Sequence, residues 1–102
     1  MLKLLKVAGN SLSPFIQEGD FVLVLKIPFF FINIHSGDIV AFHHSIYGVM
    51  IKQVEHLSSD KEEIFVIGRH PDSIDSRHFG PIHTRELIGK VICHIRKPVA
   101  NL

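Results

Sequence analysis

The feature that most restricts the fold of this chain is a series of short apolar runs, each bounded by turn-forming residues. The runs are rich in β-branched and aromatic residues, which favour strands, and they cover residues 21–26, 38–44, 49–57, 64–68 and 87–96. With 102 residues the chain makes one domain, residues 1–102, with a single core. We predict a mainly β fold, either a small curled antiparallel sheet or a partly open barrel, with one or two short helical turns.

Helical signals occur in two places only. Ser13 as N-cap, Pro14 at the first helical position and Gly19 as terminator indicate about one turn near the start. Thr84 is a candidate cap for a second short turn. The stretches "EGDFVLV" and "SGDIVAF" each place a Gly-Asp turn before a strand. There the glycine supplies an unusual backbone angle and the aspartate binds nearby amides.

Composition excludes several classes of protein. Hydrophobic residues make up 46% and charged residues 21%, as in a globular domain. A net charge of +1 provides no basic field for nucleic acid. The single cysteine, Cys93, is predicted to be buried in a strand.

Membrane attachment is limited by the length of the apolar runs. The longest uncharged run is too short to cross a bilayer, which takes about 20 residues, and the start lacks the apolar length of a signal peptide. The phenylalanines of residues 28–31, "PFFF", belong either to the core or to a loop tip that touches lipid. We therefore expect a chain that is cytoplasmic or peripheral at a membrane.

One lysine lies in an apolar strand. In "GVMIKQVEHL", strand alternation places Met50, Lys52 and Val54 on one face. Burial there would disfavour the ammonium form and make the amine a base near neutral pH, whereas at a sheet edge the side chain would extend into water. Such a base could activate a serine of "GNSLSP", either Ser11 or Ser13. The G-x-S-x-G motif that would place a Ser-His-Asp triad does not occur.

Five motifs follow one another in a familiar order: "GNSLSP", "GDFVLV", "GDIVAF", "VMIKQV" and "DSIDSRHFGPI". From about residue 7 to 90, the chain resembles the catalytic core of type I signal peptidases, which share a Ser-Lys core with LexA-type self-cleaving repressors. The membrane anchor and large second domain of typical signal peptidases have no counterpart. The chain is thus most similar to small soluble members, such as those proposed to mature nickel superoxide dismutase.

The resemblance implies a role for each matching residue. Ser11 corresponds to the nucleophile and Lys52 to the general base. Ser73 corresponds to a serine that hydrogen-bonds and orients the lysine, while Asp75 and Arg77 correspond to a pair that braces the site.

The same resemblance implies an acyl-enzyme mechanism without cofactor or metal. The backbone amide of Ser11 and a group near Gly9 would stabilise the oxyanion. A polypeptide substrate would bind as an added strand and be cut after small residues. Some positions depart from the family pattern: Leu12 replaces methionine, Gln53 replaces an arginine, and residues 69–70 are Arg-His in place of Asp-Asn.

Other functions remain open at this stage. The domain could be a catalytically silent β-domain used for binding or assembly, which would need neither Ser11 nor Lys52. A LexA-type repressor is disfavoured because only ten residues precede Ser11. A metal protein is disfavoured because the histidines lack ligand partners at suitable spacing. The oligomeric state and the natural substrate are not determined by the sequence.

Overall fold

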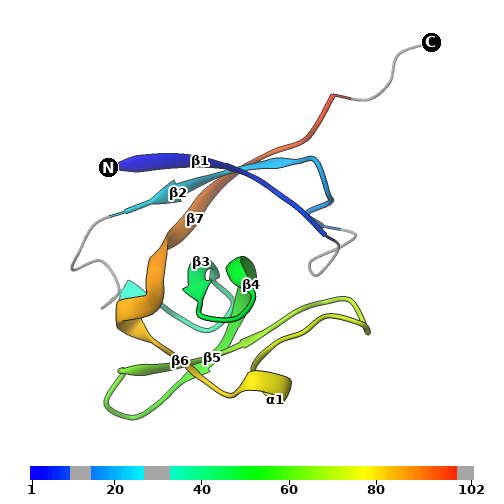
Figure 1. Ribbon diagram of the computed structural model, residues 1–102. Coiled ribbons are helices and arrows are strands. Elements are labelled where there is room, and N and C mark those ends of the chain that lie inside the picture. Colours follow the sequence, from blue (N-terminus) through cyan, green and yellow to red (C-terminus); the bar gives the residue numbers. More distant parts are fainter. Residues whose placement is uncertain (10–14, 27–32, 99–102) are drawn as a thin grey trace.

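The computed structural model describes residues 1–9, 15–26 and 33–98. Its strands join one sheet in the order β1-β2-β7-β3-β4-β5-β6, and every neighbouring pair is antiparallel. The sheet is strongly curled: Figure 1 shows β1 and β2 at one end, β5 and β6 at the other, and β7 bending between them. The strands are β1 (Leu2–Lys6), β2 (Phe21–Leu25), β3 (Ile39–His44), β4 (Gly48–Leu57), β5 (Glu63–Ile67), β6 (Ile82–His83) and β7 (Leu87–Ile95). The predicted mainly β fold is confirmed, and β1 and β6 are two strands that were not predicted.

The curl places hydrophobic core on both faces of the central strand β3. Val40 and Phe42 belong to a cluster with residues of β4, β5 and β6, whereas Ala41 points the other way, into a cluster with β2. The approach of β7 to β2 depends on Gly89, since a Cβ there would lie 2.2 Å from the carbonyl oxygen of Leu25. A side chain at that position would force the strands apart, so the glycine permits the bend.

Two short helices lie near the carboxyl end. Helix α1 (Ser76–Phe79) was not predicted, and η2 (Thr84–Glu86) is the second predicted turn. The cap of η2 is not Thr84, as predicted, but His83, whose side chain accepts a hydrogen bond from the Arg85 amide.

The helical turn predicted near the start is not found in its described part. Residues 15–19 form turns, and Ser13 and Pro14 lie outside the described residues. The Asp20 carboxylate accepts a hydrogen bond from the amide of Gln17 at 2.9 Å, and Gly19 has a φ of +91°. These features close a tight turn in place of a helix. They also confirm the predicted roles of glycine and aspartate in the Gly-Asp turn. Asp38 of the second turn likewise accepts a hydrogen bond, from the amide of His35.

Cys93 is exposed, so the prediction of a buried cysteine is wrong. Beyond Lys90, the pairing of β7 involves β2 alone, and the face that Cys93 shares with Leu23 faces water. Within the described ranges, no helix has the length and apolarity needed to cross a membrane. The phenylalanines of residues 28–31, which carried the predicted lipid contact, lie outside those ranges.

Candidate active site

Lys52 lies in the middle of β4 and is 3% exposed. Its partner across the strand pair is Val40, which is fully buried, and Val54 on the same face is also buried. The predicted alternation of β4 is therefore correct, and the buried alternative for the lysine holds.

Burial changes the acid–base properties of this amine. Removal from water disfavours the ammonium form and lowers the pKa of Lys52. The carboxylate of Asp75 acts in the opposite direction, and the guanidinium of Arg77 lowers this pKa further. The amine is thus shifted towards the neutral form that a general base requires.

Asp75 and Arg77 form a braced pair at the start of α1. Asp75 is fully buried and receives two bonds from the guanidinium of Arg77, at 3.0 and 2.7 Å. The amides of Gly68 and Arg77 also donate to its carboxylate, at 2.9 and 3.0 Å. Burial alone would raise the pKa of Asp75, but these hydrogen bonds hold it well below its usual range. The carboxylate therefore fastens the end of β5 to α1 as an anion at neutral pH.

Ser73 lies on the loop between β5 and α1 and is 7% exposed. Its hydroxyl donates a hydrogen bond to the carbonyl oxygen of His70 at 2.8 Å. A hydroxyl that donates elsewhere still has lone pairs with which to accept a bond from an amine. The hydroxyl hydrogen of Ser73 is thus used within its own loop, in the bond to His70. A hydrogen bond between Ser73 and Lys52 stays a prediction.

The chain before the predicted nucleophile is held by hydrogen bonds. Gly19 donates to the carbonyl of Val7 at 2.8 Å, and Gly9 donates to the carboxylate of Glu18 at 3.4 Å. Gly9 has a φ of +84°, a conformation that favours glycine. Ser11 itself lies outside the described residues.

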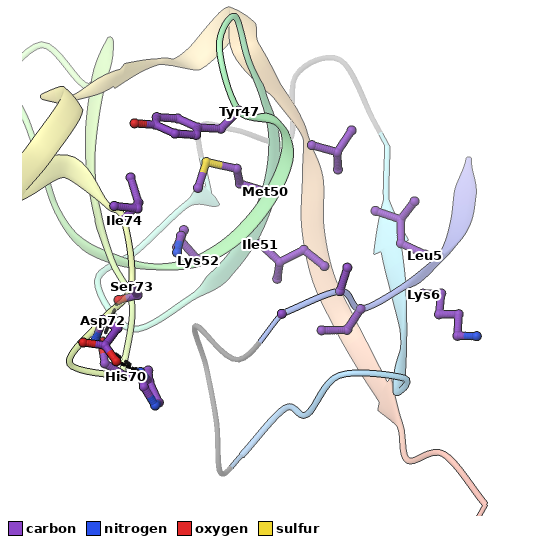
Figure 2. Close-up of a pocket in the computed structure, with 14 residues that line it drawn as sticks. Leu5, Lys6, Tyr47, Met50, Ile51, Lys52, His70, Asp72, Ser73 and Ile74 are labelled. Atoms are coloured by element: carbon purple, nitrogen blue, oxygen red, sulfur yellow. Dashed lines mark hydrogen bonds and ion pairs between the residues drawn. The ribbon is translucent and has the colours of Figure 1, made fainter.

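A cleft of about 690 Å³ brings these parts together. Figure 2 shows Lys52 on the side of β4 that faces Ser73 and Ile74, while Lys6 on the opposite wall points away. Lys52, Ser73 and Gly9 therefore share one cleft, whereas Asp75 and Arg77 support it from outside. Its lining comes from the end of β1, the β3–β4 hairpin and the loop before α1, namely residues 5–9, Tyr47, 49–52, His70 and 72–74.

The apolar wall around Tyr47 was not predicted. His44 accepts hydrogen bonds from the amides of Ile46 and Tyr47, at 3.0 and 3.3 Å, and its ring packs on Phe79 at 4.6 Å. These contacts fix the hairpin that carries Tyr47 beside the cleft. The sequence carried one signal for this wall, the turn "SIYG". It directly precedes the strand of Lys52, so its residues lie near that lysine.

Three histidines act as local caps for backbone amides. Each accepts a backbone N–H on Nδ1: His70 from Asp72 at 3.2 Å, His78 from Asp75 at 3.3 Å and His83 from Arg85 at 3.1 Å. In the part of the chain that the structure describes, no three histidine, cysteine, aspartate or glutamate side chains gather as metal ligands would. These histidines thus have a structural use, and His70 is the one among them that lines the cleft.

The chain is similar in sequence to known proteins. The profile of the Peptidase S24-like family matches residues 1–92. The chain belongs to this family. A relative, signal peptidase I V of Bacillus subtilis (strain 168), is 28% identical over 136 residues, an alignment that covers 84% of this chain and 81% of the relative. The predicted relationship to signal peptidases is confirmed.

Membership of the S24-like family gives the cleft a chemical context. It supports a peptidase of the serine type. The alignment with the Bacillus relative is longer than the 102 residues of this S24-like chain, so the relative contains segments without a counterpart here.

Proposed function

We propose that this chain is a serine endopeptidase in which Ser11 is the nucleophile and Lys52 the general base. The observation that carries the proposal is the environment of Lys52: a lysine 3% exposed, in a cleft that Gly9 and Ser73 also line. A buried amine without a chemical task would be costly to retain in a small core. A silent binding domain of the same fold gives no reason to keep it there.

The reaction proceeds through an acyl-enzyme. Neutral Lys52 takes the proton of the Ser11 hydroxyl as its oxygen bonds to the peptide carbonyl carbon. The Lys52 ammonium then protonates the leaving amine as the carbon–nitrogen bond breaks. Lys52 next removes a proton from water, whose oxygen bonds to the ester carbon, and the Lys52 ammonium returns the proton to the Ser11 oxygen as the ester bond breaks and the product acid leaves. The amide of Ser11, with a group near Gly9, stabilises the oxyanion in both steps.

The substrate is an extended polypeptide cut after small residues. β1 is an end strand of the sheet, and residues 5–9, which are its last two residues and the three that follow, line the cleft. A peptide added beside this end of the sheet would form main-chain hydrogen bonds and place alternate side chains in the cleft. The apolar lining favours uncharged side chains there.

The two serines of "GNSLSP" provide a matched test of the nucleophile. Ser11→Ala should reduce cleavage of an alanine-rich signal-type peptide by ~10⁴-fold or more, because the acyl-enzyme can no longer form. Ser13→Ala removes the hydroxyl of the second serine, two residues further along, and should retain nearly full activity. Cleavage is followed by mass spectrometry of the peptide products. Equal rates for Ser11→Ala and wild type would contradict the proposal.

Removing the charge of Arg77 or of Asp75 should shift the pH dependence of kcat/KM in opposite directions, because the two charges act oppositely on the pKa of Lys52. Activity should rise with pH as Lys52 loses its proton, with an apparent pKa below the ordinary value for lysine. Arg77→Gln removes a positive charge that lowers this pKa, so the rise should move to higher pH. Asp75→Asn removes a negative charge that raises it, so the rise should move to lower pH.

Initial rates measured between about pH 6 and 11 test this prediction. Arg85→Gln, a change at an exposed arginine outside the cleft, is the control and should leave the profile in place. Shifts of the same sign in both variants would mean that Lys52 does not set the pH dependence.

A further inference from the structure

The side chains of Arg69 and Phe15 form a cation–π contact, with the guanidinium carbon 4.9 Å from the centre of the ring. Both residues are exposed, and Phe15 keeps 61% of its surface open to water. A guanidinium within about 6 Å of an aromatic face is attracted by the negative charge of that face. The contact is therefore attractive although neither side chain is buried.

This contact joins parts of the chain that come from distant strands. Phe15 lies on the segment that leads into β2, whereas Arg69 follows β5. In the sheet, β7, β3 and β4 separate β2 from β5. The contact thus spans the curled sheet.

Both ends of the contact are anchored in the fold. Ile16, next to Phe15, is buried in the cluster that contains Val7. Gly68, next to Arg69, donates its amide hydrogen to the buried carboxylate of Asp75. A contact between Phe15 and Arg69, whose neighbours are both anchored, restricts the distance between the segment before β2 and the loop after β5.

We propose that Arg69 and Phe15 are positioning residues for the peptidase reaction, an inference that rests on the proposed function. Phe15 directly follows segment 10–14, which carries Ser11, and Arg69 lies at the start of the loop that carries Ser73. Their contact holds the flank of the nucleophile's segment against the loop beside the general base.

Kinetics of paired variants test the proposal. Arg69→Gln and Phe15→Leu should each lower kcat by about twofold to fivefold, the size expected of an exposed cation–π contact, with KM unchanged. Phe15→Tyr keeps an aromatic face and should restore the wild-type kcat. The double variant Arg69→Gln/Phe15→Leu should be no slower than either single variant, because both remove one contact. Arg96→Gln, at another exposed arginine, should have no effect.

Hydrogen exchange provides a readout that needs no activity. Peptides covering residues 7–20 and 68–74 should exchange faster in Arg69→Gln and in Phe15→Leu than in wild type or Phe15→Tyr. Unchanged exchange, multiplicative kinetic losses in the double variant, or a Phe15→Tyr variant as slow as Phe15→Leu would overturn the proposal. Failure of the proposed function would be distinguishable, since it would show as cleavage independent of Ser11.

Discussion

Replacing Lys52 with methionine is expected to abolish peptide cleavage and, at the same time, to make the protein more resistant to heat. Methionine has nearly the same length and fits among Val40 and Val54, but it has no amine to take a proton. Loss of the base should reduce kcat/KM by ~10⁴-fold or more, as for other members of a catalytic pair. The variant no longer places an amine in the core, so unfolding should cost about 1 kcal/mol more, which raises Tm by roughly 4–8 °C.

The gain in stability should depend on pH. The pKa of Lys52 is lowered in the folded state, so the unfolded chain binds more protons between the lowered pKa and the ordinary lysine value. Wild-type stability therefore rises with pH in that window. The advantage of Lys52→Met should be fully present below the lowered pKa and should shrink as the pH rises through it.

Thermal unfolding followed by circular dichroism, together with peptide cleavage, measures both effects. Lys61→Met, a change at an exposed lysine in the turn between β4 and β5, is the matched control and should alter neither. A Lys52→Met protein that cleaves peptide at the wild-type rate would exclude the lysine as the base. A variant that is inactive and also much less stable would show that the amine supports the fold.

Asp75→Asn is expected to have the largest effect on stability. The fully buried carboxylate binds the guanidinium of Arg77 and accepts amide hydrogens from Gly68 and Arg77. Asparagine has the same shape, but its NH₂ group would face donors. Breaking a buried ion pair costs about 3–5 kcal/mol, and the lower end applies because the side chain of Arg77 is 61% exposed. A loss of about 3 kcal/mol corresponds to a fall in Tm of roughly 12–24 °C.

The pH dependence of this loss has a definite sign. Since hydrogen bonds hold the pKa of Asp75 well below its usual range, its contribution is fully present above about pH 4 and is lost as the pH falls through the folded pKa. Urea unfolding at pH 7 and at pH 3 should therefore show a smaller difference between variant and wild type at pH 3. Asp72→Asn, at a side chain 92% exposed, should change stability by less than about 0.5 kcal/mol. Equal stability of Asp75→Asn and wild type at pH 7 would contradict the bracing role.

The face of the strand that Lys52 occupies was predictable because it depends on local pattern, whereas its burial was left open because it depends on β4 lying inside the sheet. Alternation along one strand fixes which face a residue occupies, and the neighbours Met50 and Val54 mark that face as apolar. The Gly-Asp turns were predictable for the same reason, since the backbone angle and the side-chain acceptor are properties of adjacent residues.

Features that depend on pairing between distant segments were not predictable. The apolar run that contains Cys93 is typical of a buried strand. Cys93 is nevertheless exposed because β7 pairs with β2 alone beyond Lys90. The contact between Arg69 and Phe15 depends on the curl of the sheet, and neither residue carries a local signal for it. Helix α1 was hidden because Asp75 and His78, which cap it, are also typical of loops.

The central claim is that Ser11 becomes acylated with Lys52 as its base. The most direct measurement is intact-protein mass spectrometry after rapid acid quenching of wild type, Ser11→Ala and Lys52→Met with an alanine-rich peptide ester. Acid quenching preserves an ester on serine. We expect a mass increase equal to the acyl part of the substrate in wild type alone, mapped by peptide digestion to Ser11. Acylation of Ser11→Ala, or of another residue in wild type, would contradict the account.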